Sequence, residues 1–222
     1  MTLYEREKLL AEQGDADALA RLGILYLEGI EGAEQSDNKA LTCFKEAANK
    51  GDAQSYFFVG VMYYQGKGGY PEGSLQALKE AITWLEHAAK KNINNAQTLL
   101  GTLYSLMGSM YYEGKGVSQD YSMAAQWYRK GAEHGNDDSQ LKLGFAYSFG
   151  EGVGQDNAEA VKWYRESANQ GNAYAQYNMG DAYQNGKGVT QDFIEAIKWY
   201  RLAAEQGISQ AQENITLLSM FI

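Results

Sequence analysis

The chain has 222 residues and a formal net charge of −9. Because nucleic-acid-binding proteins usually carry a basic face, this charge argues against a nucleic-acid partner and against an anionic membrane surface. It leaves proteins or peptides, basic ones included, as the expected partners. The single cysteine excludes an intrachain disulfide, and with only two histidines it cannot complete a sulfur-and-imidazole metal site, so no metal or cofactor is expected.

The first segment, residues 1–13, begins MTLYEREKLL and is predicted to be the remnant of a helix before the first repeat. It carries Glu5 and Glu7 where a secretory signal would be basic. No stretch of the chain approaches the ~20 apolar residues that a membrane-spanning helix needs. We therefore expect a cytoplasmic protein without membrane insertion, exported only if a leader has been removed.

The dipeptide Trp-Tyr recurs at a fixed interval, starting at Trp127, Trp163 and Trp199, which are 36 residues apart. The surrounding residues repeat as well, as in GKGVSQDYSMAAQWYRKGAEHG and GEGVGQDNAEAVKWYRESANQG. A fixed period of this length is typical of stacked repeat proteins. Alignment on the glycine at each repeat boundary, replaced once by Asn92, predicts one domain with an N-terminal cap, five repeats and a C-terminal capping helix. Their bounds are 1–13, 14–50, 51–91, 92–134, 135–170, 171–206 and 207–222.

Each repeat is predicted to fold as two antiparallel helices. Helix A begins at a capping side chain and carries small and apolar residues that end in Gly-x-x-Tyr. A turn of the form Gly-x-Gly-Val follows, and helix B then places its buried stripe at helical spacing, as in Ala196, Trp199, Tyr200 and Ala203. The predicted caps are Asp15, Ser36, Asp52, Ser74, Asp120, Asn136, Asp156, Asn172 and Asp192. The expected fold is all-α, an α-solenoid of stacked antiparallel helix pairs.

Two repeats depart from this pattern. The second carries an insert, GKGGYPEGSLQA, which is expected to project a loop and to start helix B a turn early, at Ser74. The third contains LLGTLYS followed by LMGSMYY, a doubled cassette. Since seven residues fall about 20° short of two helical turns, helix A should keep its face and run ~10 Å longer. The duplication is either tolerated without a function, or it widens the inner surface or changes the superhelix.

These repeats resemble the Sel1-like repeat family, a relative of the tetratricopeptide repeat. The family pattern, A-x-x-x-L-G-x-x-Y-x-x-G-x-G-V-x-x-D-x-x-x-A-x-x-W-Y-x-x-A-A-x-x-G, fits the fifth repeat nearly everywhere, and the resemblance covers nearly the whole chain. The matching residues are Ala175, Met179, Gly180, Tyr183, Gly186, Gly188, Val189, Asp192, Ala196, Trp199, Tyr200, Ala203, Ala204 and Gly207. The resemblance implies an α-solenoid whose A helices line the concave face. Some members carry a cysteine pair in each repeat, and activities of that branch do not carry over to this chain.

We find no catalytic constellation, and the chain is not expected to be an enzyme. His87 and His134 lie near the ends of B helices, where they suit surface positions or the helix dipole. Cys43 occupies the place of the tryptophan in the other repeats, which predicts a small core residue with little reactivity. The Gly-x-Gly-Val turns follow a helix rather than a strand, which argues against phosphate-binding loops.

A partner-binding surface is predicted at exposed A-helix positions that the repeat motif does not use. This surface contains no lysine or arginine and is rich in aromatic residues, which typify protein interfaces. The predicted partner-binding residues are Phe57, Val61, Tyr64, Tyr112, Leu141, Phe145, Phe149, Tyr174, Tyr177 and Asp181. The alternative for each aromatic residue is simple core packing between neighbouring A helices.

The predicted function is a non-enzymatic scaffold or adaptor that binds a protein or peptide on this face. A narrower alternative is an immunity or regulatory protein that occludes one cognate partner. An enzyme or a small-molecule binder is the alternative from a different class. The expected state is a monomer, or a weak homodimer through the apolar end of the C-terminal helix, which contains Leu217, Leu218, Met220, Phe221 and Ile222.

Overall fold

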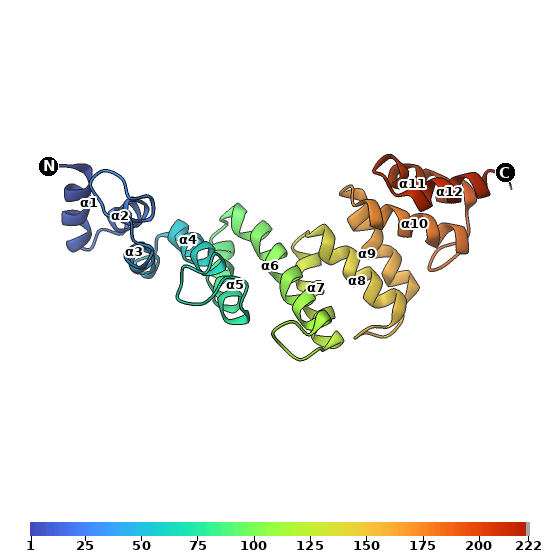
Figure 1. Ribbon diagram of the computed structural model, residues 1–222, viewed down its shortest axis with the longest axis horizontal. Coiled ribbons are helices and arrows are strands. Elements are labelled where there is room, and N and C mark those ends of the chain that lie inside the picture. The colour runs from blue at the N-terminus through green and yellow to red at the C-terminus, as the bar shows by residue number, and fades with distance from the viewer. Residues whose placement is uncertain (221–222) are drawn as a thin grey trace. The chain divides into compact units, whose positions relative to one another are not determined.

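The computed structural model describes residues 1–220, and this part of the chain forms twelve α-helices and no strand (Figure 1). The helices are α1 (Leu3–Glu12), α2 (Ala16–Glu28), α3 (Asp37–Asn49), α4 (Ala53–Tyr64), α5 (Leu75–Lys90), α6 (Asn94–Glu113), α7 (Tyr121–Glu133), α8 (Asp137–Phe149), α9 (Asn157–Asn169), α10 (Ala173–Asn185), α11 (Phe193–Glu205) and α12 (Ser209–Leu218). Among the helices described, none is both long and apolar enough to cross a membrane.

The chain divides into two compact units, Met1–Leu100 and Gly101–Ile222, with the boundary inside α6. In both units, helices that follow each other in the chain pack side by side, as α2 does on α3 and α10 on α11. The second helix of one repeat also packs on the first helix of the next, as α9 does on α10. This stacking of adjacent pairs confirms the all-α solenoid predicted from the repeats.

The helix starts follow the capping residues in the sequence. All nine predicted caps have extended backbone, and each side chain accepts a hydrogen bond from the backbone N–H three residues further on. Such a bond satisfies one of the N–H groups that the first helical turn leaves without a partner. The residue at the end of a repeat has the left-handed backbone expected of it, and this includes Asn92, whose φ is 61°.

The two aromatic residues of each Trp-Tyr pair have different roles. Tyr200 is fully buried within its own repeat, where its ring lies against Gly180 of α10. A Cβ atom on Gly180 would lie 2.5 Å from Cδ1 of that ring, so glycine allows the two helices to approach closely. Trp199 is only half-buried and packs on the core cluster that contains Met179 and Tyr164. Tyr200 therefore joins the two helices of its repeat, and Trp199 packs on a cluster drawn from its own repeat and from the preceding one.

The two unusual repeats also fold as predicted at the level of their helices. Helix α5 has 16 residues where most others have 13, and it begins directly after the cap Ser74. The insert before it turns back on α4, because the ring of Tyr70 stacks on Tyr63 with centroids 6.2 Å apart. Helix α6 has 20 residues, in agreement with the doubled cassette. Of its two glycines, Gly108 receives the Tyr128 ring, whereas Gly101 faces the junction of α7 and α8.

The last helix covers the end of the second unit. Leu218 is buried against α11, in a core cluster with Tyr200 and Ala203. Leu217 and Met220 are exposed, at 55% and 73%. The other two residues of the predicted apolar end, Phe221 and Ile222, lie outside the described residues.

Cys43 is expected to react slowly with thiol reagents in the folded protein. It is free, it is 9% exposed, and burial, followed by the nearby charge of Glu46, raises the pKa of its thiol to about 11. Since the thiolate is the reactive form, a shift of two pKa units lowers the rate at pH 8 roughly 100-fold. Alkylation should be slow in buffer, fast in denaturant, and should accelerate as the pH rises towards 11. Equal rates in buffer and in denaturant would contradict this prediction.

Candidate partner-binding site

A cavity of ≈ 530 Å³ opens in the second unit between α6, α7 and α8. We call it the aromatic notch. It is lined by Ser109, Tyr112, Glu113, Tyr121, Ala124, Ala125, Tyr128, Leu141, Lys142, Phe145, Ala146, Phe149 and Glu151. Its volume lies within the range of typical ligand pockets.

The floor of the notch is the ring of Tyr128. Gly108 lets this ring lie directly on α6, and only 4% of the residue remains exposed. The Tyr128 hydroxyl donates to Oγ of Ser109 at 3.4 Å. Burial, the largest cause, raises the pKa of Tyr128 to about 12, so the hydroxyl stays protonated at neutral pH. The small side chains of Ala124 and Ala125 leave open the space above α7.

Two pairs of aromatic rings form the walls. Tyr112 of α6 and Tyr121 of α7 lie with centroids 5.2 Å apart. Gln119 holds them together, since its Nε2 donates to the Tyr112 carbonyl at 2.8 Å and to the Tyr121 hydroxyl at 3.1 Å. On α8, Phe145 and Phe149 stack with centroids 6.2 Å apart. Phe149 is 66% exposed, so the wall that it forms is open to a partner.

A lysine lines one end of the notch. Nζ of Lys142 lies 2.9 Å from Oδ2 of Asp138 and donates to Oγ of Ser109 at 2.9 Å. The same ammonium lies 5.5 Å from the centroid of the Tyr128 ring. The predicted A-helix positions contain no lysine or arginine, whereas the cavity has Lys142. The prediction covered only certain positions counted from the helix-A glycine. Lys142, two residues before Gly144, is not one of them.

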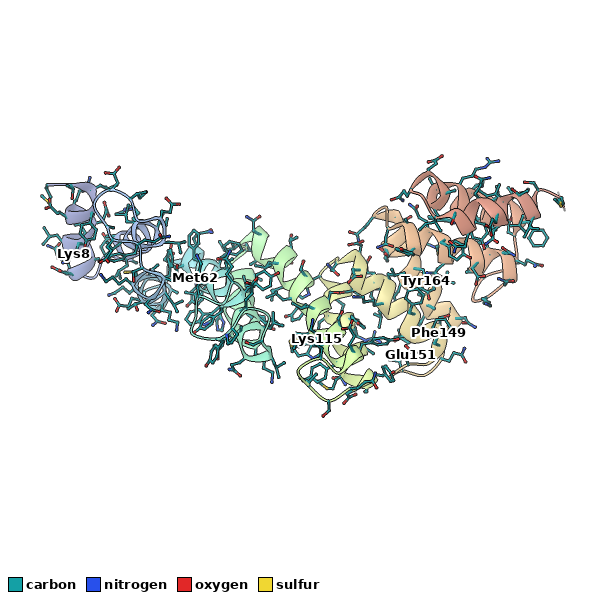
Figure 2. All side chains as sticks on the ribbon, in the orientation of Figure 1. Lys8, Met62, Lys115, Phe149, Glu151 and Tyr164 are labelled. Atoms are coloured by element: carbon teal, nitrogen blue, oxygen red, sulfur yellow. The ribbon has the colours of Figure 1, made fainter. Side chains whose placement is uncertain are left out.

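Two glutamates lie at the rim. Glu113 ends α6, and Glu151 follows the end of α8, where Figure 2 shows it beside Phe149. After burial, the charge of Glu151 is the main cause that raises the pKa of Tyr112. Glu113 adds in a smaller way to the raised pKa of Tyr128. Among the described residues, neither carboxylate forms an ion pair with a lysine or arginine.

The structure brings four of the predicted partner-binding residues together in the notch: Tyr112, Leu141, Phe145 and Phe149. Leu141 was expected to be exposed, but it is 7% exposed and belongs to a core cluster with Val161 and Met179. The predicted exposure of Leu141 is wrong because the neighbouring helix α9 covers most of the side chain. Only its edge reaches the cavity.

The other predicted residues lie elsewhere. Tyr174 is 64% exposed, whereas Tyr177 is half-buried, with its ring 5.4 Å from that of Tyr200. Asp181 forms an ion pair with Lys187 at 3.3 Å. Three further predicted residues belong to α4 in the first unit and are half-buried there: Phe57, Val61 and Tyr64.

The same notch recurs one repeat further on, in a reduced form. A cavity of ≈ 100 Å³ is lined there by Phe145, Ser148, Phe149, Asn157, Ala160, Val161, Tyr164, Asn178, Asp181, Ala182 and Lys187. Each of these residues follows a lining residue of the aromatic notch by 36 positions, and only the positions of Leu141 and Phe149 have no counterpart in the smaller cavity. Phe145 replaces the small Ser109 and fills the space, and the Asp181–Lys187 ion pair stands where the first notch has Phe145 and Glu151.

Sequence reasoning missed the contribution of helix B and of the rim. Tyr121, Ala124 and Tyr128 come from α7, and Glu113 and Glu151 come from helix ends. One signal was present in the sequence. The turns read Gly-Lys-Gly-Val, Gly-Glu-Gly-Val and Gly-Lys-Gly-Val in successive repeats, so Glu151 is a reversal of charge at a position that otherwise repeats.

The chemistry of the notch is that of a binding site. The buried Tyr128 phenol is protonated, the ammonium of Lys142 is paired with Asp138, and two carboxylates lie at the rim. Over the described residues, no three histidine, cysteine, aspartate or glutamate side chains are grouped to hold a metal ion. Aromatic walls with few polar groups suit a side chain of a partner protein.

The Sel1 repeat model matches the chain five times, at residues 16–52, 53–93, 95–136, 137–172 and 173–208. The chain belongs to the Sel1 repeat family. Sel1 repeat proteins generally mediate protein–protein interactions and are typically non-catalytic scaffolds. The resemblance seen in the repeat motif is thereby confirmed. No curated protein sequence matches the chain.

Solved structures that are similar to this chain include two Sel1 repeat proteins. One is c5321, a protective antigen of uropathogenic Escherichia coli strains, with 34% identity and a TM-score of 0.53 over 96% of this chain. The chain spans 50% of the length of that protein. The other is a Sel1 repeat protein from Oxalobacter formigenes, with 30% identity and a TM-score of 0.53, covering 91% of this chain and 76% of that one.

Proposed function

We propose that the protein is a non-enzymatic interaction scaffold that binds a partner protein or peptide in the aromatic notch. The observation that carries the proposal is the notch itself: an open cavity of ≈ 530 Å³ whose walls are aromatic rings. Interfaces concentrate their binding energy in a few aromatic anchors that lie in such pockets. The family supports the same class of function.

The narrower form of this proposal is an immunity or regulatory protein that occludes a single cognate partner. The net charge of −9 and the two rim glutamates are compatible with that role, since both favour a basic protein surface as the ligand. A complex of one copy of each protein, in which the partner loses its own activity, is the expected result for this form. A partner that keeps its activity when bound points to an adaptor.

Loss of the exposed notch aromatics should weaken partner binding without loss of fold. We expect Tyr112→Ala with Phe149→Ala to weaken a partner's affinity at least about tenfold, because both rings are wall residues of the notch. The partner is first recovered by affinity purification with mass spectrometry and is then titrated by calorimetry. Circular dichroism should show unchanged helicity, since the two residues are 40% and 66% exposed.

The matched control is Ile194→Ala with Leu202→Ala on α11, which also removes two exposed apolar side chains, 60% and 43% exposed, outside the notch. This variant should bind the partner as the wild type does. If the notch variant keeps its affinity, or if both variants lose affinity equally, the notch is not the binding site.

A further inference from the structure

We propose that the aromatic notch recognises an arginine side chain of the partner, flanked by an apolar residue. This inference rests on the proposed function and specifies the chemistry of its ligand. It begins from the two rim carboxylates, Glu113 and Glu151, which have no cationic partner among the described residues.

The charges around the notch favour a cation. Among the described residues, Lys142 is the only lysine or arginine that lines the cavity, and its charge is matched by Asp138 at 2.9 Å. Glu113 and Glu151 therefore leave two negative charges unmatched at the mouth. A basic ligand would find complementary charge there, whereas an acidic ligand would be repelled.

The rings favour a flat cation. A cation within about 6 Å of an aromatic face is attracted by the ring quadrupole. The notch already shows this contact, since Nζ of Lys142 lies 5.5 Å from the centroid of the Tyr128 ring. Tyr112, Tyr121 and Phe149 offer further rings close to the rim, where the carboxylates lie. A planar guanidinium can stack on such rings and bind a carboxylate through two N–H groups, which the ammonium of lysine cannot do.

The neighbouring notch provides an internal comparison. At the positions of Phe145 and Glu151, it has Asp181 and Lys187, which neutralise each other at 3.3 Å. Its volume is ≈ 100 Å³ instead of ≈ 530 Å³. The same frame of helices is therefore closed and neutral in one repeat, and open and negative at its rim in the other. The larger volume exceeds one side chain, which leaves room for the apolar neighbour of the arginine.

The test is a titration followed by NMR, with the peptide acetyl-Leu-Arg-Leu-amide as the probe. The matched probe replaces arginine with citrulline, which keeps the shape and removes the charge. We expect saturable shifts of aromatic resonances of Phe145, Phe149 and Tyr112, and an affinity about tenfold higher for the arginine peptide. Added salt should reduce this difference, because the rim carboxylates are open to solvent.

Three variants decide the role of the rim. Glu113→Gln with Glu151→Gln should lower the affinity for the arginine peptide about tenfold and leave citrulline binding unchanged. Glu151→Lys, which copies the residue of the neighbouring turns, should abolish the preference for arginine. The control is Glu166→Gln, which removes an exposed carboxylate on α9, outside the aromatic notch.

Equal binding of the two peptides by the wild type, or an equal loss in the control, would overturn the proposal of an arginine site. Absence of binding by both peptides would also overturn it. The proposed scaffold function fails by a different result, an unchanged partner affinity in the variant without Tyr112 and Phe149. The two failures are therefore distinguishable.

Discussion

Gly180→Ala is expected to lower the free energy of unfolding by about 1–3 kcal/mol, the usual range for an overpacked core. In an exposed helix the same change would stabilise by about 1 kcal/mol, because alanine has the higher helix propensity. In this protein the same change should destabilise the fold, because the new Cβ would lie 2.5 Å from Cδ1 of the Tyr200 ring. Tyr200 is 0% exposed, so its ring is packed on all sides. Urea denaturation followed by circular dichroism measures the change.

A double-mutant cycle separates this contact from a general effect on α10. Tyr200→Ala alone should cost about 3–5 kcal/mol, as expected for truncation of a buried aromatic residue. In that background the ring is gone, so Gly180→Ala should become neutral or stabilising. If Gly180→Ala costs the same with and without the Tyr200 ring, the close approach of the two helices is not the cause.

Arg21→Met is expected to loosen the docking of α1 by about 2–3 kcal/mol. Glu7 is 2% exposed, and its Oε2 accepts from Nε of Arg21 at 2.8 Å. Removal of one partner leaves a buried charge without compensation, which costs about 3–5 kcal/mol in a fully buried pair. We expect less than this because the Arg21 side chain is 50% exposed. Hydrogen exchange of the α1 amides measures the loss locally.

The double variant Glu7→Met with Arg21→Met is the control for this pair. An apolar pair of similar volume often replaces a buried ion pair without loss of stability. The amides of α1 should therefore regain most of their protection. Equal loss in the single and the double variant would show that the Arg21 stem, and not the charge of Glu7, governs the docking of α1.

The helices could be predicted from the sequence because each depends on local signals. The caps, the terminal glycines and the spacing of Ala196, Trp199 and Tyr200 are all written within one repeat. Even the irregular parts followed this logic, since a doubled cassette lengthened α6 and Ser74 started α5 early. No knowledge of the neighbouring repeat was needed for any of these features.

The notch could be predicted only in part, because it depends on contacts between repeats. Phe145, Phe149 and Tyr112 were found from their positions on the A helices. Leu141 was placed wrongly because coverage by α9 is not visible from the spacing within α8. Lys142 and Tyr121 were missed because they reach the cavity from positions that the helix-A register excludes. The volume of the cavity could not be predicted either. It depends on whether the position of Ser109 holds a serine or, as in the next repeat, a phenylalanine.

Comparison of the two cavities distinguishes the residues that pack the helices together from the residues that line the cavity. Gly108 and Tyr128 hold the helices together in one repeat as Gly144 and Tyr164 do in the next, while Ser109 and Glu113 give way to Phe145 and Phe149. Substitutions at the positions of Ser109 and Glu113 change which ligand the cavity can bind. They leave the contact between Gly108 and Tyr128, which holds the helices together, unchanged. Each contact between neighbouring repeats can therefore evolve its own binding pocket. A repeat protein can in this way acquire several binding specificities, one repeat at a time.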